Sequence, residues 1–172
     1  MGVSGSGKTT IGRRVAAALD WPYFEADDFH SPANREKMAR GEPLDDRDRA
    51  PWLAAIRAKM DACRGEGKSA VFTCSALKEE YRATLCGTAS DVVLVFLHGS
   101  FEMIQARVAH RQGHFLKSEL VRSQFETLEP PKDALTLDVA SPPAEIVEQI
   151  LARLGTVREN RSAAEQGPQP AT

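Results

Sequence analysis

The first ten residues have the types and the spacing of a loop that binds phosphate. Gly2, Gly7, Lys8 and Thr9 fill the pattern G-x-x-x-x-G-K-[ST], in which glycines let backbone N–H groups approach phosphate oxygens. The helix expected to start near Lys8 directs its positive dipole end toward the same anion. Lys8 would contact the β- and γ-phosphates of a nucleotide, and the Thr9 hydroxyl would ligate Mg²⁺. We therefore predict that ATP binds through Gly2, Ser4, Gly5, Ser6, Gly7, Lys8, Thr9 and Thr10.

Two other interpretations of this stretch are weaker. A flexible Gly/Ser-rich terminus would not place four fixed positions of the motif directly before an amphipathic helix, in which Ile11, Val15 and Leu19 lie four residues apart. The pattern Met1-Gly2-x-x-x-Ser6 also matches an N-myristoylation signal. Gly2 does not easily serve both as an acyl acceptor and as a buried loop glycine, so we treat the lipid motif as a chance match.

Acidic side chains follow a predicted strand, at the sheet edge where ligands bind in open α/β folds. The strand is expected at residues 23–27, so that Glu25 and Asp27 share one of its faces. Phosphoryl transfer needs Mg²⁺ and an acceptor hydroxyl that gives up its proton. One carboxylate could orient a water on Mg²⁺ while the other accepts the proton. For Asp28 we favour helix capping or a solvated charge.

Basic side chains are candidates for neutralising the charge that moves in such a transfer. Arg107 and Arg111 lie four residues apart on one predicted helix face, directly before a Gly-containing break. They could close over ATP as a lid, with one cation on adenine and another on phosphate, although a solvated basic face fits each arginine alone equally well. Lys78 and Arg82 follow the strand expected at residues 70–74, where a substrate would lie.

The rest of the chain alternates strands with helices. Continuous apolar runs predict buried strands, and apolar residues three or four apart predict helices. Strands are expected at residues 23–27, 70–74, 92–97 and 135–140. Helices stand between them, among them 8–19, 51–64 after a polar loop, and 142–154. This alternation predicts an α/β fold in which a parallel sheet is covered by helices on both faces.

Composition places the chain among ordinary globular proteins. Of its 172 residues, 42% are hydrophobic and 27% are charged, and the net charge is −2. This balance gives no sign of a nucleic-acid or membrane partner. Three cysteines without metal spacing and no visible secretory signal predict reduced thiols in the cytoplasm. We expect one domain at 1–155, with a lid at about 111–120, and a disordered tail at 156–172.

Taken together, these stretches resemble the gluconate kinases, a family of P-loop kinases, and the resemblance runs from Met1 to about Leu154. Its most specific stretches are Ser75-Ala76-Leu77-Lys78 and Gln124-Phe125-Glu126-Thr127-Leu128-Glu129. The others are the phosphate-binding loop, Asp27-Asp28-Phe29-His30, Gly41-Glu42-Pro43-Leu44, Asp48-Arg49, Pro51-Trp52-Leu53, Tyr81-Arg82 and Gly113-His114-Phe115.

The resemblance implies that ATP and Mg²⁺ are used to phosphorylate D-gluconate to 6-phospho-D-gluconate, in a cytoplasmic homodimer. It places Asp27 near the accepting hydroxyl, and it implies that Lys8, Asp27 and Arg111 are catalytic, while Arg107 contacts the nucleotide. The sugar acid would be surrounded by side chains that suit an anion, namely His30, Arg49, Lys78 and Arg82 together with Asp27.

Two features depart from the family pattern. The family usually has Asp-Gly where Glu25-Ala26 stands here. Glu25 would contact Mg²⁺ through a water, and its side chain is one methylene longer than that of the usual aspartate. A phosphate-binding loop also normally follows a buried strand, yet only Met1 precedes Gly2. We expect this first strand to be largely missing and its neighbours to keep unpaired backbone groups, each costing about 1–3 kcal/mol when buried. We hypothesise that the natural product starts several residues upstream.

Two alternatives stand beside a gluconate kinase. One is a P-loop kinase of the same fold that acts on another small hydroxy acid, such as shikimate. The other is a nucleotide-binding module without catalysis. Asp27, Lys78 and the Arg107/Arg111 pair argue against the module, because a pure binder needs no carboxylate on the acceptor side.

Overall fold

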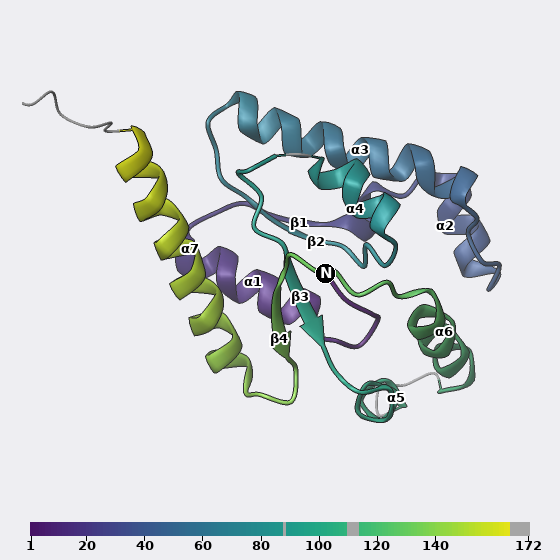
Figure 1. Cartoon of the computed structure of the whole chain (residues 1–172). Helices are drawn as coiled ribbons and strands as arrows, with labels where there is room; N and C mark the ends of the chain where they lie inside the picture. The colour runs from purple at the N-terminus through teal and green to yellow at the C-terminus, as the bar shows by residue number, and fades with distance from the viewer. Residues whose placement is uncertain (88, 110–113, 166–172) are drawn as a thin grey trace, which may run out of the picture.

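Strands and helices alternate along the chain, as the sequence predicts (Figure 1). The computed structural model describes the backbone of residues 1–87, 89–109 and 114–165, and their side chains except at 114–118 and 157–165. The strands are β1 (Tyr23–Glu25), β2 (Val71–Thr73), β3 (Val95–His98) and β4 (Leu135–Asp138). The helices are α1 (Lys8–Leu19), the 3₁₀ turn η1 (Ala26–Phe29), α2 (Pro32–Ala39), α3 (Asp46–Gly65), α4 (Glu79–Cys86), α5 (Phe101–Ala109), α6 (His114–Thr127) and α7 (Pro143–Glu165).

The strands are parallel, as predicted, but they form two pairs instead of one continuous sheet. β1 pairs with β2, so that Phe24 lies opposite Phe72, and β3 pairs with β4. Met1 runs along the other edge of β3, where its amino group donates to the Val95 carbonyl at 2.5 Å and its carbonyl accepts from Leu97 N–H at 3.0 Å. Gly2 N–H donates to the Ser75 carbonyl, just beyond β2, at 3.3 Å, so Met1 and Gly2 together form a backbone link between the two pairs.

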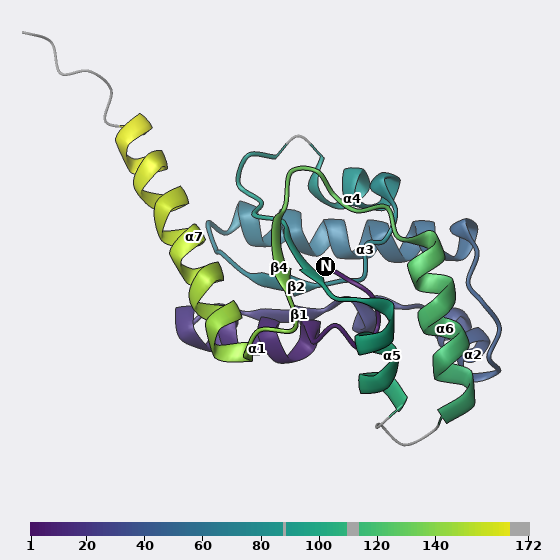
Figure 2. The same cartoon turned by 60° about the horizontal axis from the view of Figure 1, so that its bottom comes forward.

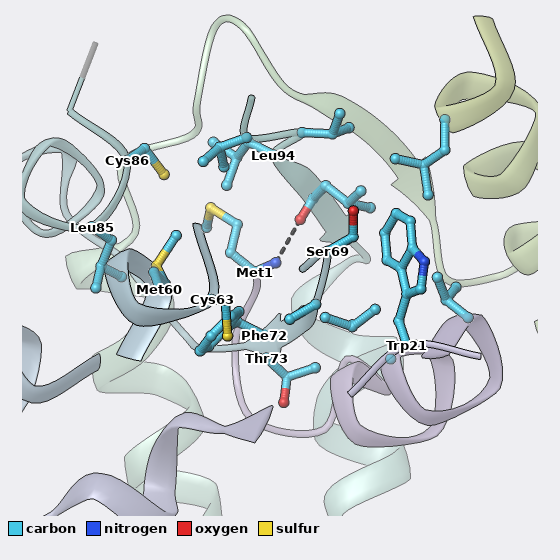
Figure 3. Close-up of a pocket in the computed structure, with 18 of the residues that line it drawn as sticks. Met1, Trp21, Met60, Cys63, Ser69, Phe72, Thr73, Leu85, Cys86 and Leu94 are labelled. Atoms are coloured by element: carbon cyan, nitrogen blue, oxygen red, sulfur yellow. Dashed lines mark hydrogen bonds between the residues drawn. The ribbon is translucent and has the colours of Figure 1, made fainter. Parts of the chain in front are cut away.

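A cavity of about 650 Å³ lies between the two pairs of strands (Figure 3). The Met1 side chain projects into it, and Met60, Phe72, Leu85 and Leu94 are among the mostly apolar residues around it. The edge of β2 that faces away from β1 has no strand partner among the described residues. The expected gap beside the phosphate-binding loop is therefore present in the structure.

Helices cover both faces of the strands and enclose two apolar clusters. α1 packs against α7 on one side, and α3 packs against α4 on the other, while α5 and α6 lie side by side (Figures 1 and 2). One cluster gathers around Val15, Ile104 and Val121, and the second around Trp52 and Ile56. Among the described residues, no helix is long and apolar enough to cross a membrane.

Two helix boundaries differ from the sequence prediction. α3 begins at Asp46 instead of residue 51, because the Asp45 and Asp48 side chains cap each other's backbone N–H groups in a capping box. α7 continues through Gly155 to Glu165, so the prediction of a disordered tail from residue 156 is wrong over this stretch. A single glycine costs a helix only about 1 kcal/mol, and the good helix formers Ala152, Arg153 and Leu154 precede this one. Residues 166–172 lie outside the described residues.

Candidate active site

The loop before α1 has the backbone shape that phosphate binding requires. Gly5 has φ +85°, and a Cβ there would lie 2.5 Å from Val108 Cγ2, so only glycine fits. Gly7 is the N-cap of α1 and supplies no side-chain acceptor. The N–H groups of the first turn, which begins at Lys8, are therefore left for an anion. Ser6 Oγ is buried here without a partner, which also marks a place for a polar ligand atom.

Lys8 lies partly buried beside the loop and close to two carboxylates. Its Nζ donates to the Val3 carbonyl at 3.0 Å. Burial lowers the pKa of Lys8, and the nearby charges of Asp27 and Glu25 oppose that shift. A bound nucleotide phosphate would add negative charge at the same point and favour the ammonium form. The structure thus brings together the predicted phosphate-binding lysine and both predicted carboxylates.

Glu25 is held at the end of β1 by hydroxyl groups. Tyr23 Oη donates to Glu25 Oε2, and Thr73 Oγ1 donates to Oε1 at 2.7 Å. Burial alone would raise the pKa of Glu25, but hydrogen bonds from Tyr23, Thr73 and Thr9 outweigh it and lower that pKa below its ordinary value. Glu25 is therefore an ionised carboxylate beside Thr9, and its extra methylene does not keep it from the Thr9 hydroxyl, the predicted Mg²⁺ ligand.

These groups fit a magnesium ion that is held mainly by phosphate oxygens and waters. Among the residues that the structure describes, no three His, Cys, Asp or Glu side chains gather into a metal site. Mg²⁺ in kinases commonly uses few protein ligands and keeps several waters. The Thr9 hydroxyl can supply a direct ligand, and Glu25 can hold a coordinated water. Both roles stay predictions.

Removing the Tyr23 hydroxyl should destabilise the protein in a pH-dependent way. Folding lowers the pKa of Glu25, so its ionised form adds stability above the ordinary value of 4.5, and that contribution is lost as the pH falls below it. We expect Tyr23→Phe to lower the free energy of unfolding by about 1 kcal/mol at pH 7, since the carboxylate is partly solvated, and by less near pH 3. Urea denaturation across this range measures the difference.

The control for this prediction is the same substitution in a Glu25→Gln background. There the carboxylate is absent, so the effect of Tyr23→Phe should no longer change between neutral and acidic pH. A pH-dependent loss that persists in this background would show that Tyr23 acts through another group.

Asp27 is exposed, and it lies in a turn after β1 instead of within the strand that the sequence predicts. β1 ends at Glu25, and Asp27 lies in the 3₁₀ turn η1, so the prediction that the two acids share a strand face is wrong. The turn forms because Trp52 Nε1 donates to the Ala26 carbonyl at 2.7 Å and holds that residue in the core. Asp27 nevertheless lies near enough to Lys8 for its negative charge to oppose the lowering of that lysine's pKa by burial. Asp28, also exposed, accepts from Arg35 through its backbone carbonyl.

His30 links the Asp27 turn to the basic side of the site. Its ring stacks on Trp52 at 4.6 Å between centroids, and its Nδ1 is buried without a partner. Burial lowers the pKa of His30, with Asp27 raising it and the arginines Arg35 and Arg49 lowering it further. The imidazole is therefore neutral at physiological pH, and the charges of Asp27 and Arg49 act on it in opposite directions.

Arg49 and Lys78 converge on one carboxylate, that of Asp46. Lys78 Nζ lies 3.0 Å from Asp46 Oδ2, and Arg49 Nη1 lies 3.6 Å from Asp46 Oδ1. Tyr81 Oη donates to Asp46 and accepts from Arg49 at 3.2 Å. The hydrogen bonds that Lys78 donates to the Asp46 and Glu80 carboxylates raise its pKa. The predicted pair of cations is thus brought together around a carboxylate, the kind of group that both were predicted to bind.

The remaining predicted residues are less directly placed. Arg82 is only 8% exposed and donates to the Ala76 and Leu77 carbonyls at 3.1 and 2.9 Å, which supports the turn where Ala76 has φ +43°. This placement fits a positioning role better than the predicted contact with a sugar acid. Arg107 donates to the Val139 carbonyl at 2.6 Å. Arg111 lies outside the described residues, as do the other residues from 110 to 113.

Sequence reasoning missed several residues that complete the site. Tyr23 and Thr73 hold Glu25, and the alternation of Tyr23 with Glu25 on one strand face was the available signal. Asp46 bridges the two cations, and Gln124 reaches the phosphate-binding loop. For Gln124 the signal was its place in the specific Gln-Phe-Glu stretch, but nothing local showed what it contacts.

Comparisons with known proteins show which proteins the chain is similar to. A family model described as Shikimate kinase matches residues 4–155. The chain is 39% identical over 171 residues to the thermosensitive gluconokinase of Escherichia coli (strain K12), covering 97% of this chain and 91% of that protein. It is 45% identical to the gluconokinase of Gluconobacter oxydans (strain 621H), over 77% of this chain and 75% of that one. Its structure is similar to that of a gluconokinase from Sinorhizobium meliloti 1021, with a TM-score of 0.83, 45% identity, and coverage of 98% and 95% of the two chains.

Proposed function

The chain belongs to the gluconokinases within the shikimate kinase-like family of P-loop kinases, and we propose that it transfers the γ-phosphoryl group of ATP to D-gluconate. The observation that carries the proposal is a row of groups whose charges act on one another. Asp27 acts on both Lys8 and His30, and Arg49 also acts on His30. Arg49 and Lys78 both pair with Asp46. A phosphate donor fits at one end, and an acid with hydroxyl groups fits at the other.

Each residue in the row has a distinct part in the transfer. Asp27 accepts the proton of the attacking hydroxyl, whose oxygen forms a bond to the γ-phosphorus while the bond to the β-phosphate oxygen breaks and ADP leaves. Lys8 and the N–H groups of the first turn of α1 stabilise the charge on the phosphoryl oxygens. Mg²⁺, when bound beside Thr9 and Glu25, neutralises charge on the β- and γ-phosphates. The product is 6-phospho-D-gluconate.

Arg49 and Lys78 recognise the carboxylate of the sugar acid. In the structure Asp46 occupies both of them, so the substrate carboxylate competes for hydrogen bonds that are already formed in its absence. The buried Nδ1 of His30 has no hydrogen-bond partner, which supports a contact between this residue and a sugar hydroxyl. Neutral sugars lack the group that these cations bind, so glucose is a poor substrate.

Replacing Arg49 or Lys78 with methionine should raise KM for gluconate about tenfold or more and leave KM for ATP nearly unchanged. A hydrogen bond to a charged group contributes about 1.5–3 kcal/mol, and methionine keeps the length of the side chain without its charge. Steady-state kinetics with each substrate varied in turn measures the split. Lys132→Met, at an exposed lysine after α6, is the matched control. Equal effects on both substrates would indicate a structural role.

An ADP-release assay over a panel of acceptors tests the function itself. D-gluconate should support turnover far above the rate without acceptor, whereas shikimate and glucose should not. Preference for shikimate would favour a kinase for another hydroxy acid, which the family description alone also allows. Nucleotide binding with no release for any acceptor would favour a non-catalytic module.

The resemblance to the gluconate kinases also supports two further proposals, one on localisation and one on oligomeric state. We propose that the enzyme works in the cytoplasm, where its three free cysteines stay reduced. We also propose that it works as a homodimer, the state that the resemblance implies.

A further inference from the structure

The end of α6 touches both loops of the active site. Gln124 Oε1 accepts from the N–H of Ser4, in the phosphate-binding loop, at 2.6 Å. Just after the helix, Glu129 Oε2 accepts from Glu79 N–H at 2.5 Å, and Glu129 N–H donates to the Leu77 carbonyl at 3.0 Å. The last two contacts flank Lys78. In both overall views the segment that joins α6 to β4 runs beside α4 (Figures 1 and 2).

The hydrogen bond between Ser4 N–H and Gln124 holds part of the phosphate-binding loop, here called the nucleotide loop, from outside that loop. Gly5 and Gly7 give this loop its shape and leave it little intrinsic stiffness, because glycine loses much conformational freedom on ordering. The Gln124 amide oxygen holds the backbone one residue before Gly5. A loop already held in this way has less entropy to lose when phosphate binds.

The contacts at Glu79 and Leu77 hold the segment between β2 and α4, here called the acceptor loop because it carries Lys78. Lys78 is the N-cap of α4 but makes no capping hydrogen bond with its own side chain. Glu129 supplies that cap instead, and its negative charge lies at the positive end of the helix. Holding Leu77 and Glu79 also sets the backbone from which the Lys78 side chain extends toward Asp46.

α6 is anchored well enough to serve as a common support. Val121 is fully buried, and the Phe125 ring packs edge-on against Phe101 at 5.4 Å between centroids. Both side chains lie within the stretch that carries Gln124, so that residue cannot shift without disturbing the core.

We propose that Gln124 and Glu129 are positioning residues, which set the nucleotide loop and the acceptor loop at fixed places on one support. The acceptor half of this inference rests on the proposed function, whereas the nucleotide half does not. Neither residue needs to touch a substrate, so each acts on the substrate whose loop it holds.

Titration calorimetry and kinetics on single variants separate the two halves. Gln124→Met keeps the length of the side chain but offers no acceptor oxygen, and it should raise Kd for a non-hydrolysable ATP analogue about fivefold while leaving KM for gluconate within twofold. Glu129→Ala should raise KM for gluconate about fivefold and leave analogue affinity within twofold. Glu126→Ala, at an exposed glutamate between them, is the control and should change neither.

The two halves are overturned by different results. Unchanged substrate constants in both variants, or equal losses for both substrates with a lower melting temperature, would contradict the positioning roles. A wild-type protein that does not phosphorylate gluconate would remove the proposed function, but the nucleotide effect of Gln124→Met would still be expected. Hydrogen exchange at the Ser4 amide of the wild type needs no variant. It should be slow, and exchange at the rate of an exposed amide would overturn the Gln124 contact.

Discussion

Replacing Lys8 with alanine should lower kcat by about a thousandfold or more. The Lys8 amine is a partly buried cation at the start of α1, where the structure leaves N–H groups for phosphate, and Asp27 and Glu25 lie close enough to influence it. No other lysine lies in this loop to replace the lost charge. Single-turnover measurements with saturating ATP would separate the loss in chemistry from any loss in nucleotide binding.

Arg14→Ala is the matched control for Lys8→Ala. Arg14 lies on α1 but is exposed, so its removal should leave kcat within about twofold. Circular dichroism should show that both variants are folded. A Lys8→Ala protein with near-wild-type kcat would refute the assignment of this loop as the phosphoryl-binding element.

Asp27→Asn should lower kcat by about a hundredfold to ten-thousandfold, with little change in the affinity for an ATP analogue. The amide has nearly the shape of the carboxylate, but it cannot take the proton of the attacking hydroxyl. Because Asp27 is exposed in η1, the substitution should not destabilise the fold. Its effect should therefore appear in turnover rather than in melting temperature.

Asp28→Asn tests whether any carboxylate in this turn would serve. Asp28 is the next residue, equally exposed, and makes its described contact through its backbone carbonyl. We expect its substitution to leave kcat nearly unchanged. If Asp27→Asn instead weakened nucleotide binding and left turnover per bound ATP intact, Asp27 would belong to the nucleotide side of the site.

The sequence predicted those parts of the site that depend on short spacing. Gly2, Gly7 and Lys8 form a motif whose geometry is local, so the structure could differ little from the expectation. The placement of Asp27 after β1 was also predicted, although η1 replaced the last residues of the expected strand. A hydrogen bond from Trp52, far along the chain, produces that difference.

The parts that could not be predicted depend on pairs distant in sequence. Gln124 and Ser4 are 120 residues apart, and Lys78 and Asp46 are 32 apart, so no periodicity links them. Arg82 illustrates the converse case. Its charge and position suggested a substrate contact, but in the fold its guanidinium lies against backbone carbonyls. A side chain's type limits what it can do, and only the packing decides which neighbour it meets.

The most direct test of the central claim is phosphorus NMR of a reaction containing the purified chain, ATP, Mg²⁺ and D-gluconate. The γ-phosphate signal of ATP should disappear as ADP and a single phosphate ester form in step, and the ester signal should be split by the two protons of the terminal carbon of gluconate. Lys8→Ala should show almost no ester over the same time. ADP that forms with inorganic phosphate alone, or an ester at another position of the sugar acid, would contradict the proposed reaction.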